Sequence, residues 1–270
     1  MAGILSKIRT TLEMIKWEHS IFALPFALTA MLLAAGGLPG WSTVAWIVVA
    51  MVAARSAAMA FNRWADADLD AENPRTKNRA IPAGLLTRKF VLGFICAAVL
   101  VFLLAAAELN RLTLELAPLA LGLAPAAAWI AVRGSLDPRI LVLTAAVTLW
   151  AGGFDVLYAC QDYEHDRAAG LHSLPQAVGI ATAFRAARVL HMAALGALAW
   201  FAWLFHFGLA GWLGIAAVGL LLAYEHAIVS PRDLRRLNAA FFTMNGVIAM
   251  VFLAFVSADL WLRHGEHFTR

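Results

Sequence analysis

The chain has 270 residues, of which 62% are hydrophobic and 14% are charged, and its formal net charge is +4. Soluble domains contain roughly 45–50% apolar and about 25% charged residues, so this composition excludes an ordinary soluble protein and indicates an integral membrane protein. Basic loops on the inner face of a lipid bilayer explain the positive charge better than binding to nucleic acid does.

The predicted elements begin with residues 1–19, an amphipathic segment that is expected to form a helix on the cytoplasmic surface. Apolar runs of about 20 residues follow, and each is long enough to cross a hydrocarbon core of roughly 30 Å as a helix. They predict eight spans, at residues 20–38, 43–62, 89–107, 112–132, 139–158, 186–206, 211–230 and 239–262. The predicted fold is therefore an all-α, polytopic transmembrane helical bundle that forms a single domain over residues 1–270.

The distribution of lysine and arginine predicts the orientation of these spans. Residues 63–89 and 231–236 are rich in basic side chains, whereas the loops at 36–42 and 207–211 contain neither lysine nor arginine. Basic loops remain on the cytoplasmic side of a membrane. We therefore expect a multi-pass protein of a bacterial-type inner (cytoplasmic) membrane, with the two basic loops on the cytoplasmic side.

The two cysteines are too few for a disulfide framework and lack the spacing of a zinc site. Cys96 and Cys160 lie inside or next to apolar runs. We expect both to be buried as small hydrophobic residues.

The first acidic motif, NRWADADLD, follows the second predicted span. Asn62, Asp66 and Asp70 are spaced i, i+4 and i+8, so they share one face of a helix, whereas Asp68 points elsewhere. Carboxylates beside a membrane-spanning helix are costly to keep and indicate a function.

The second acidic motif, DVLYACQDYEHD, follows another long apolar span. At about 100° per residue, Asp155, Asp162 and Asp166 fall within about 40° of one another on a helix. A single acidic turn after a span is more often a solvated helix end. Two such faces of matched spacing are harder to explain in that way.

Two aspartate-rich faces repel each other unless a positive group lies between them. Mg²⁺ suits this role, because proteins usually hold it with a few carboxylates together with substrate phosphates. The loop after the first motif supplies Arg75, Lys77 and Arg79, whose side chains can bind phosphate oxygens. The two motifs therefore predict Mg²⁺ bound to a diphosphate.

Together these features resemble the UbiA superfamily of intramembrane aromatic prenyltransferases. The resemblance covers most of the chain and rests on both acidic motifs, the loop NPRTKNRAIPAG and the segment IKWEHSIFALPFAL. It implies a bundle, usually of nine transmembrane helices, around a central cavity that is open to lipid. It also implies transfer of a polyprenyl chain from a polyprenyl diphosphate to an aromatic acceptor, with Mg²⁺ as the cofactor.

The resemblance implies a role for each residue of the motifs. The expected metal ligands are Asp66, Asp70, Asp162 and Asp166. The expected catalytic residues, near the reacting ring or the C1 carbon of the donor, are Asp155 and Tyr158. The expected substrate-binding residues are Arg55, Asn62, Lys77 and Arg79. An arginine inside a span needs an anion, which for Arg55 is the diphosphate, an acceptor carboxylate or a structural partner such as Asp155.

The nearest subgroup comprises the 4-hydroxybenzoate polyprenyltransferase-like proteins, which include enzymes of the futalosine route to menaquinone that act on 1,4-dihydroxy-6-naphthoate. The segments GLHSLP, residues 170–175, and RRLNAAFFTMNG, residues 235–246, resemble this subgroup. The choice between a ubiquinone precursor and a menaquinone precursor stays open, because both acceptors carry an activating hydroxyl and a carboxylate.

One feature departs from the family pattern. The family has four spans between the two motifs, whereas three are predicted here, and an odd number would place the motifs on opposite faces. A re-entrant segment, short tilted helices, or a deletion that impairs catalysis would each account for this. A membrane transporter is the alternative from another class. A CDP-alcohol phosphotransferase is disfavoured, because the chain lacks the Asp-Gly signature of that class.

Overall fold

The computed structural model describes residues 2–16, 20–117, 123–231, 234 and 237–265, and every element in these ranges is helical. The chain divides into two compact units. Unit 1 comprises Met1–Ser20 and Gly40–Gly122, and unit 2 comprises Ile21–Pro39 and Leu123–Arg270. The predicted all-α class is confirmed, and a single domain over the whole chain stays a prediction.

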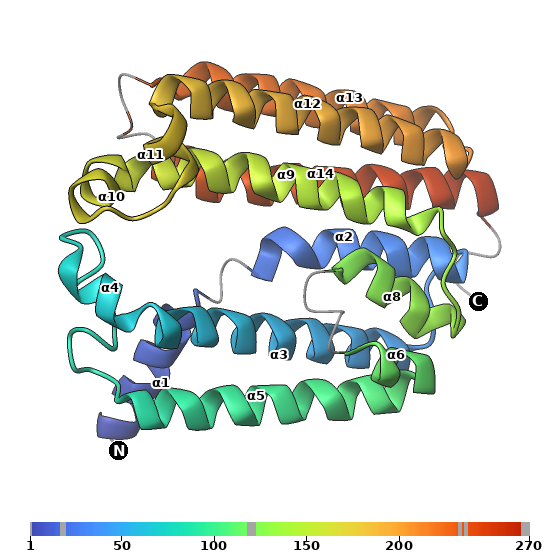
Figure 1. Cartoon of the computed structure of the whole chain (residues 1–270). Helices are drawn as coiled ribbons and strands as arrows, with labels where there is room; N and C mark the ends of the chain where they lie inside the picture. The colour runs from blue at the N-terminus through green and yellow to red at the C-terminus, as the bar shows by residue number, and fades with distance from the viewer. Residues whose placement is uncertain (1, 17–19, 118–122, 232–233, 235–236, 266–270) are drawn as a thin grey trace. The chain divides into compact units, whose positions relative to one another are not determined.

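Unit 1 contains α1 (Ala2–Ile15), α3 (Trp41–Ala65), α4 (Ala67–Glu72), α5 (Arg88–Leu109) and α6 (Arg111–Glu115). Helix α3 packs along α5, and α1 packs against α3 (Figure 1). The predicted amphipathic character of α1 is confirmed, because Met14 and Ile15 are buried whereas Arg9 is exposed and pairs with Glu13. Residues 17–19 of the predicted N-terminal segment lie outside the described residues.

Unit 2 is built around four long helices. Its elements are α2 (Ser20–Ala35, which begins one residue before the unit), α8 (Ala124–Arg133), α9 (Ile140–Ala159), the 3₁₀ turn η2 (Cys160–Asp162), α10 (Tyr163–Ala169), α11 (Leu174–Val178), α12 (Ile180–Leu204), α13 (Leu209–Ile228) and α14 (Leu237–His264). Helix α12 packs on α9 and α13, and α14 packs on α13 and α9 (Figure 1). The ring of Phe26 on α2 contacts the rings of Trp150 on α9 and Phe252 on α14.

Six helical segments of the described chain are long and apolar enough to cross a membrane: Trp41–Ala65, Arg88–Leu109, Ile140–Ala169, Ile180–Leu204, Leu209–Ile228 and Met244–Arg263. A shorter apolar helix covers Ala23–Ala35. These segments account for a multi-pass membrane protein. The predicted count of eight spans is not confirmed.

The predicted span at 112–132 is wrong as a single helix. Helix α6 ends at Glu115, α8 begins at Ala124, and Leu123 before it has φ −123° and ψ 43°, which is not helical. Helix α8 has 10 residues. Its length is therefore about 15 Å, roughly half of a hydrocarbon core. Between the two acidic motifs, α5 and α9 are the described helices that are long enough to cross.

The two cysteines differ in burial. Cys160 is buried, as expected, but the expectation for Cys96 is wrong because its side chain is exposed. The buried positions of α5 are Val91, Ile95, Ala98, Phe102, Ala105 and Ala106. Cys96 lies beside this stripe and not on it, so an apolar run alone does not bury every residue that it contains.

Candidate active site

The first acidic motif lies where α3 ends. Asp66 has φ −86° and ψ 4°, and it separates α3 from the short helix α4. The Asp66 amide still donates to the Asn62 carbonyl at 3.0 Å, and the Asp70 amide donates to the Asp66 carbonyl at 2.8 Å. The i to i−4 hydrogen bonding therefore continues across the break, and these three residues keep helical spacing.

Asp70 is the most enclosed carboxylate of this motif, with an exposed fraction of 6%. Arg79 Nη1 donates to Asp70 Oδ1 at 2.6 Å, and the Thr76 hydroxyl donates to the Asp70 carbonyl at 3.0 Å. Asp70 Oδ2 is buried and has no hydrogen-bond partner among the described residues. A buried carboxylate oxygen that accepts no hydrogen bond suits a hard cation, so Asp70 Oδ2 has the chemistry of one Mg²⁺ ligand.

Asp68 lies off this face, as its position in the sequence predicts. Its side chain is exposed, and Arg88 Nη2 donates to Asp68 Oδ1 at 2.5 Å. The hydrogen bond and the charge of Arg88 lower the pKa of the Asp68 carboxyl. Asp68 therefore offers a control position that carries the same charge on a different face.

A cavity of about 190 Å³ opens beside the motif within unit 1. Its lining includes Lys16, Arg63, Asn78 and Arg79, and also Glu13. Arg79 was predicted to bind phosphate, but Lys16 and Arg63 were not. The sequence offered one signal for Arg63, because this residue directly follows the motif residue Asn62. In the structure, Arg63 Nη1 donates to Asn62 Oδ1 at 3.1 Å.

Lys77 and Arg55 occupy different surroundings. Lys77 is exposed in the loop after α4, and its amide donates to the Asn73 carbonyl at 2.9 Å. The lining of the cavity contains Arg79 but not Lys77. Arg55 is half-buried inside α3, about two turns before Asn62.

A hydrophobic cluster in unit 1 packs around the end of α3 that carries the first motif. It includes Met14 and Ile15 of α1, Ala60 of α3, and Val91 and Ile95 of α5. Because Ala60 lies two residues before Asn62, this packing fixes the end of α3 from which the motif projects.

The second acidic motif lies at the end of α9, where the helix changes its winding. Residues Cys160–Asp162 form a 3₁₀ turn, and Asp162, with φ −97° and ψ 4°, precedes α10. A 3₁₀ turn advances by about 120° per residue instead of 100°. The prediction of one continuous α-helical face for Asp155, Asp162 and Asp166 is therefore wrong, because the turn rotates the last two relative to Asp155.

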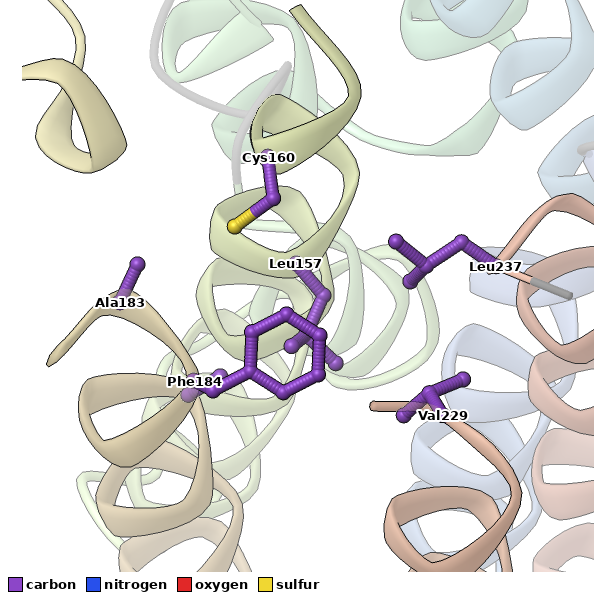
Figure 2. Close-up of a cluster of buried hydrophobic side chains, with 7 residues drawn as sticks. Leu157, Cys160, Ala183, Phe184, Val229 and Leu237 are labelled. Carbon is purple, nitrogen blue, oxygen red and sulfur yellow. The ribbon is translucent and has the colours of Figure 1, made fainter. Parts of the chain in front are cut away.

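The other side of α9 anchors the second motif. Leu157 and Cys160 are each 1% exposed and pack with Ala183 and Phe184 of α12 in the cluster of Figure 2, which also includes Val229 and Leu237 at the α13–α14 connection. Asp155 is exposed on α9 and Tyr158 is half-buried. A carboxylate that is exposed on an apolar spanning helix faces a polar environment in preference to lipid.

Each unit supplies part of the predicted site. Unit 1 holds two predicted metal ligands, Asp66 and Asp70, and unit 2 holds Asp162 and Asp166. In the part of the chain that the structure describes, no three His, Cys, Asp or Glu side chains gather in an arrangement that could hold a metal ion. The predicted metal centre stays a prediction.

Comparisons with known proteins agree with these features. The 4-hydroxybenzoate octaprenyltransferase of Cupriavidus necator is 30% identical over 252 residues, which cover 83% of this chain and 87% of the relative. The enzyme of the same name from Saccharophagus degradans is 31% identical over 251 residues, or 84% of this chain and 83% of the relative.

Solved structures agree as well. The apo structure of a UbiA homolog from Aeropyrum pernix K1 matches with a TM-score of 0.79 and 27% identity, over 90% of this chain and 98% of that chain. A UbiA homolog from Archaeoglobus fulgidus, solved with DMAPP and Mg²⁺, has the same fold, with a TM-score of 0.68 and 17% identity over 93% and 99% of the two chains. The sequence profile of the UbiA prenyltransferase family matches residues 23–124 and 116–255. The chain therefore belongs to the UbiA prenyltransferase family.

Proposed function

We propose that this prenyltransferase moves a polyprenyl chain from a polyprenyl diphosphate to an aromatic quinone precursor, either 4-hydroxybenzoate or 1,4-dihydroxy-6-naphthoate. The product would enter ubiquinone or menaquinone biosynthesis. The observation that carries the proposal is the repeated Asp-x3-Asp break at the ends of α3 and α9. The names of the relatives support an aromatic acceptor.

The acidic and basic residues have separate roles in this proposal. Asp66, Asp70, Asp162 and Asp166 hold Mg²⁺, which when bound neutralises charge that develops on the departing diphosphate. Asn62, Lys77 and Arg79 bind the phosphate oxygens and orient the donor, as preorganised donors do in other phosphate sites. The pairing of Arg79 with Asp70 supports this division, because it places a cation beside the buried carboxylate.

The reaction needs little covalent chemistry from the protein. The C–O bond of the donor breaks and its electron pair leaves with the diphosphate, the aromatic ring forms a bond to the allylic C1 carbon, and the ring then loses a proton. We assign Asp155 and Tyr158 to the reacting ring or the C1 carbon, and Arg55 to the acceptor carboxylate. A site that excludes water would protect the allylic cation from hydrolysis.

The topology between the motifs supports one shared face of the membrane. If α5 and α9 are the two crossings between the motifs, the C-terminal ends of α3 and α9 lie on the same side of the membrane. We propose that this is the cytoplasmic side of the inner membrane. The short helices α6 and α8 then do not count as crossings. On this view, the chain carries no disabling deletion.

The experiment is a prenyl transfer assay with the full chain in lipid nanodiscs. The protein is incubated with a polyprenyl diphosphate and each acceptor, with Mg²⁺ or with EDTA. We expect a prenylated product that depends on Mg²⁺, and the preferred acceptor decides between the two precursors. Folded protein that yields no product from either acceptor would contradict the proposal and favour an impaired family member.

A further inference from the structure

Two polar side chains are buried on α13 and α14, inside the spanning part of unit 2. Glu225 is 2% exposed and Asn245 is fully buried. Glu225 Oε2 and both side-chain polar atoms of Asn245 have no hydrogen-bond partner within the described ranges. Burying such atoms without a partner is costly, and the surrounding lipid supplies no water to satisfy them.

The register of the α13–α14 pair places these residues at one level. Near the start of α13, the amides of Gly208 and Gly211 each donate to the Asp259 carboxylate of α14 at 3.1 Å. One turn on, a Cβ at Gly214 would meet the side chain of Phe255, so the two helices run antiparallel in close contact.

Glu225 and Asn245 lie equally far along their helices from the contact between Gly211 and Asp259. Glu225 lies about four turns after Gly211 along α13, and Asn245 lies about four turns before Asp259 along α14. In each case the rotation about the helix axis is only about 40°, so both residues remain near the faces that the two helices turn toward each other. Glu225 and Asn245 therefore share one level of the hairpin.

The donor and acceptor atoms without partners determine which kind of group could form hydrogen bonds with them. Asn245 Nδ2 is a donor, and Asn245 Oδ1 and Glu225 Oε2 are acceptors. A hydroxyl group both donates and accepts, and so it matches this set. We propose that Glu225 and Asn245 form an internal binding site for a hydroxyl group, which accepts from Asn245 Nδ2 and donates to a carboxyl or amide oxygen.

Two sources can supply that hydroxyl. One is a water molecule, because buried waters satisfy polar groups of this kind with two to four hydrogen bonds. The other is the phenolic hydroxyl of the aromatic acceptor, and this source rests on the proposed function.

The test compares Asn245→Leu and Glu225→Met with two matched control variants. Ile248→Leu and Leu222→Met change buried apolar residues one turn away on the same helices. The melting temperature of each full-length variant in nanodiscs is measured without ligand, with 4-hydroxybenzoate and with benzoate. Benzoate lacks the hydroxyl, so the difference between the two ligands isolates its contribution.

If water fills the site, Asn245→Leu and Glu225→Met lower the ligand-free melting temperature more than their controls do. The difference in melting temperature between 4-hydroxybenzoate and benzoate then stays as in the wild type. If the acceptor fills it, the ligand-free melting temperature holds or rises, and 4-hydroxybenzoate binds about tenfold more weakly while benzoate is unaffected. The second outcome can be read even when the wild type forms no prenylated product.

A dry site would overturn the proposal. In that case both substitutions raise the melting temperature, because they remove unsatisfied polar groups, and leave the effect of the hydroxyl unchanged. Should Asn245→Leu fail to fold, Asn245→Ser, which keeps a hydroxyl, separates the cases. If Asn245→Ser folds and Asn245→Leu does not, the site is occupied. If neither Asn245 variant folds, the melting temperatures of Glu225→Met with and without ligand decide between the cases. In the double variant, a shared ligand also predicts effects that are not additive.

Discussion

Asp66 and Asp162 adopt the same backbone conformation, with φ/ψ of −86°/4° and −97°/4°. Each ends a run of helix at the edge of a membrane span and precedes a short helix that carries a second aspartate four residues later. This part of φ/ψ space is sparsely populated and recurs in active sites. The repeat of one local structure in two units agrees with the proposal that both motifs bind the metal and the diphosphate.

The first prediction concerns Asp66→Asn and Asp162→Asn. Each keeps size and shape but removes a carboxylate charge, so the barrier to donor ionisation should rise by at least about 3 kcal/mol, roughly a hundredfold or more in rate. The melting temperature should hold or rise, because repulsion between clustered carboxylates falls. Melting and prenyl transfer are measured on the same preparations.

Asp68→Asn is the matched control for these two variants. Its carboxylate lies two residues from Asp66 but pairs with Arg88 on the exposed side, so its specific activity should stay at the wild-type level. An Asp66→Asn protein that melts early yet keeps full specific activity would show that Asp66 is structural.

The second prediction concerns Arg79→Met. Asp70 is buried and already has one oxygen without a donor, so loss of the Arg79 guanidinium should destabilise the protein by about 1–3 kcal/mol. Thermal melting in the absence of Mg²⁺ measures this. Arg88→Met removes the arginine of the exposed Asp68 pair and should leave the melting temperature unchanged. Equal effects of the two substitutions would contradict the burial argument.

The third prediction concerns the joint between α9 and α12. His191 lies within hydrogen-bond distance of the Trp150 carbonyl, 3.2 Å, and of His226, 2.9 Å. A Cβ at Gly153 would lie 2.2 Å from the His191 ring. Gly153→Ala should therefore displace this histidine and cost about 1–3 kcal/mol of stability.

Gly196→Ala on α12 is the control for this joint. A Cβ there meets nothing within 4 Å, so the substitution should be neutral or stabilising by about 0.5–1 kcal/mol through helix propensity. If Gly153→Ala melts at or above the wild-type temperature, the close packing of His191 against α9 is refuted.

The sequence predicted the spacing of the first acidic motif but not the local breaks in the helices that carry the two motifs. The spacing of Asn62, Asp66 and Asp70 was visible because helical periodicity relates positions i, i+4 and i+8. The breaks at Asp66 and Asp162 were not visible, since neither position carries the glycine or proline that marks a helix end. Lys16 was missed as a lining residue because its place depends on how α1 packs against α3.

The segment 112–132 shows a second limit of sequence reasoning. Its apolar composition predicts a span, but composition does not reveal where a helix is interrupted. Pro118, Gly122 and Pro125 were the signals that the sequence offered, and Pro125 lies in the first turn of α8, where proline is tolerated. Recognising these signals would have divided the predicted span at 112–132 into two shorter segments.

Equilibrium binding tests most directly whether both motifs bind one diphosphate. The affinity of a polyprenyl diphosphate analogue that cannot ionise is measured with Mg²⁺ for the wild type, Asp66→Asn, Asp162→Asn and the double variant, with Asp68→Asn as control. Each single variant should bind at least about tenfold more weakly, and the double variant should lose less than the sum of the two effects, because the ligand is shared. Wild-type affinity in Asp162→Asn would contradict the claim.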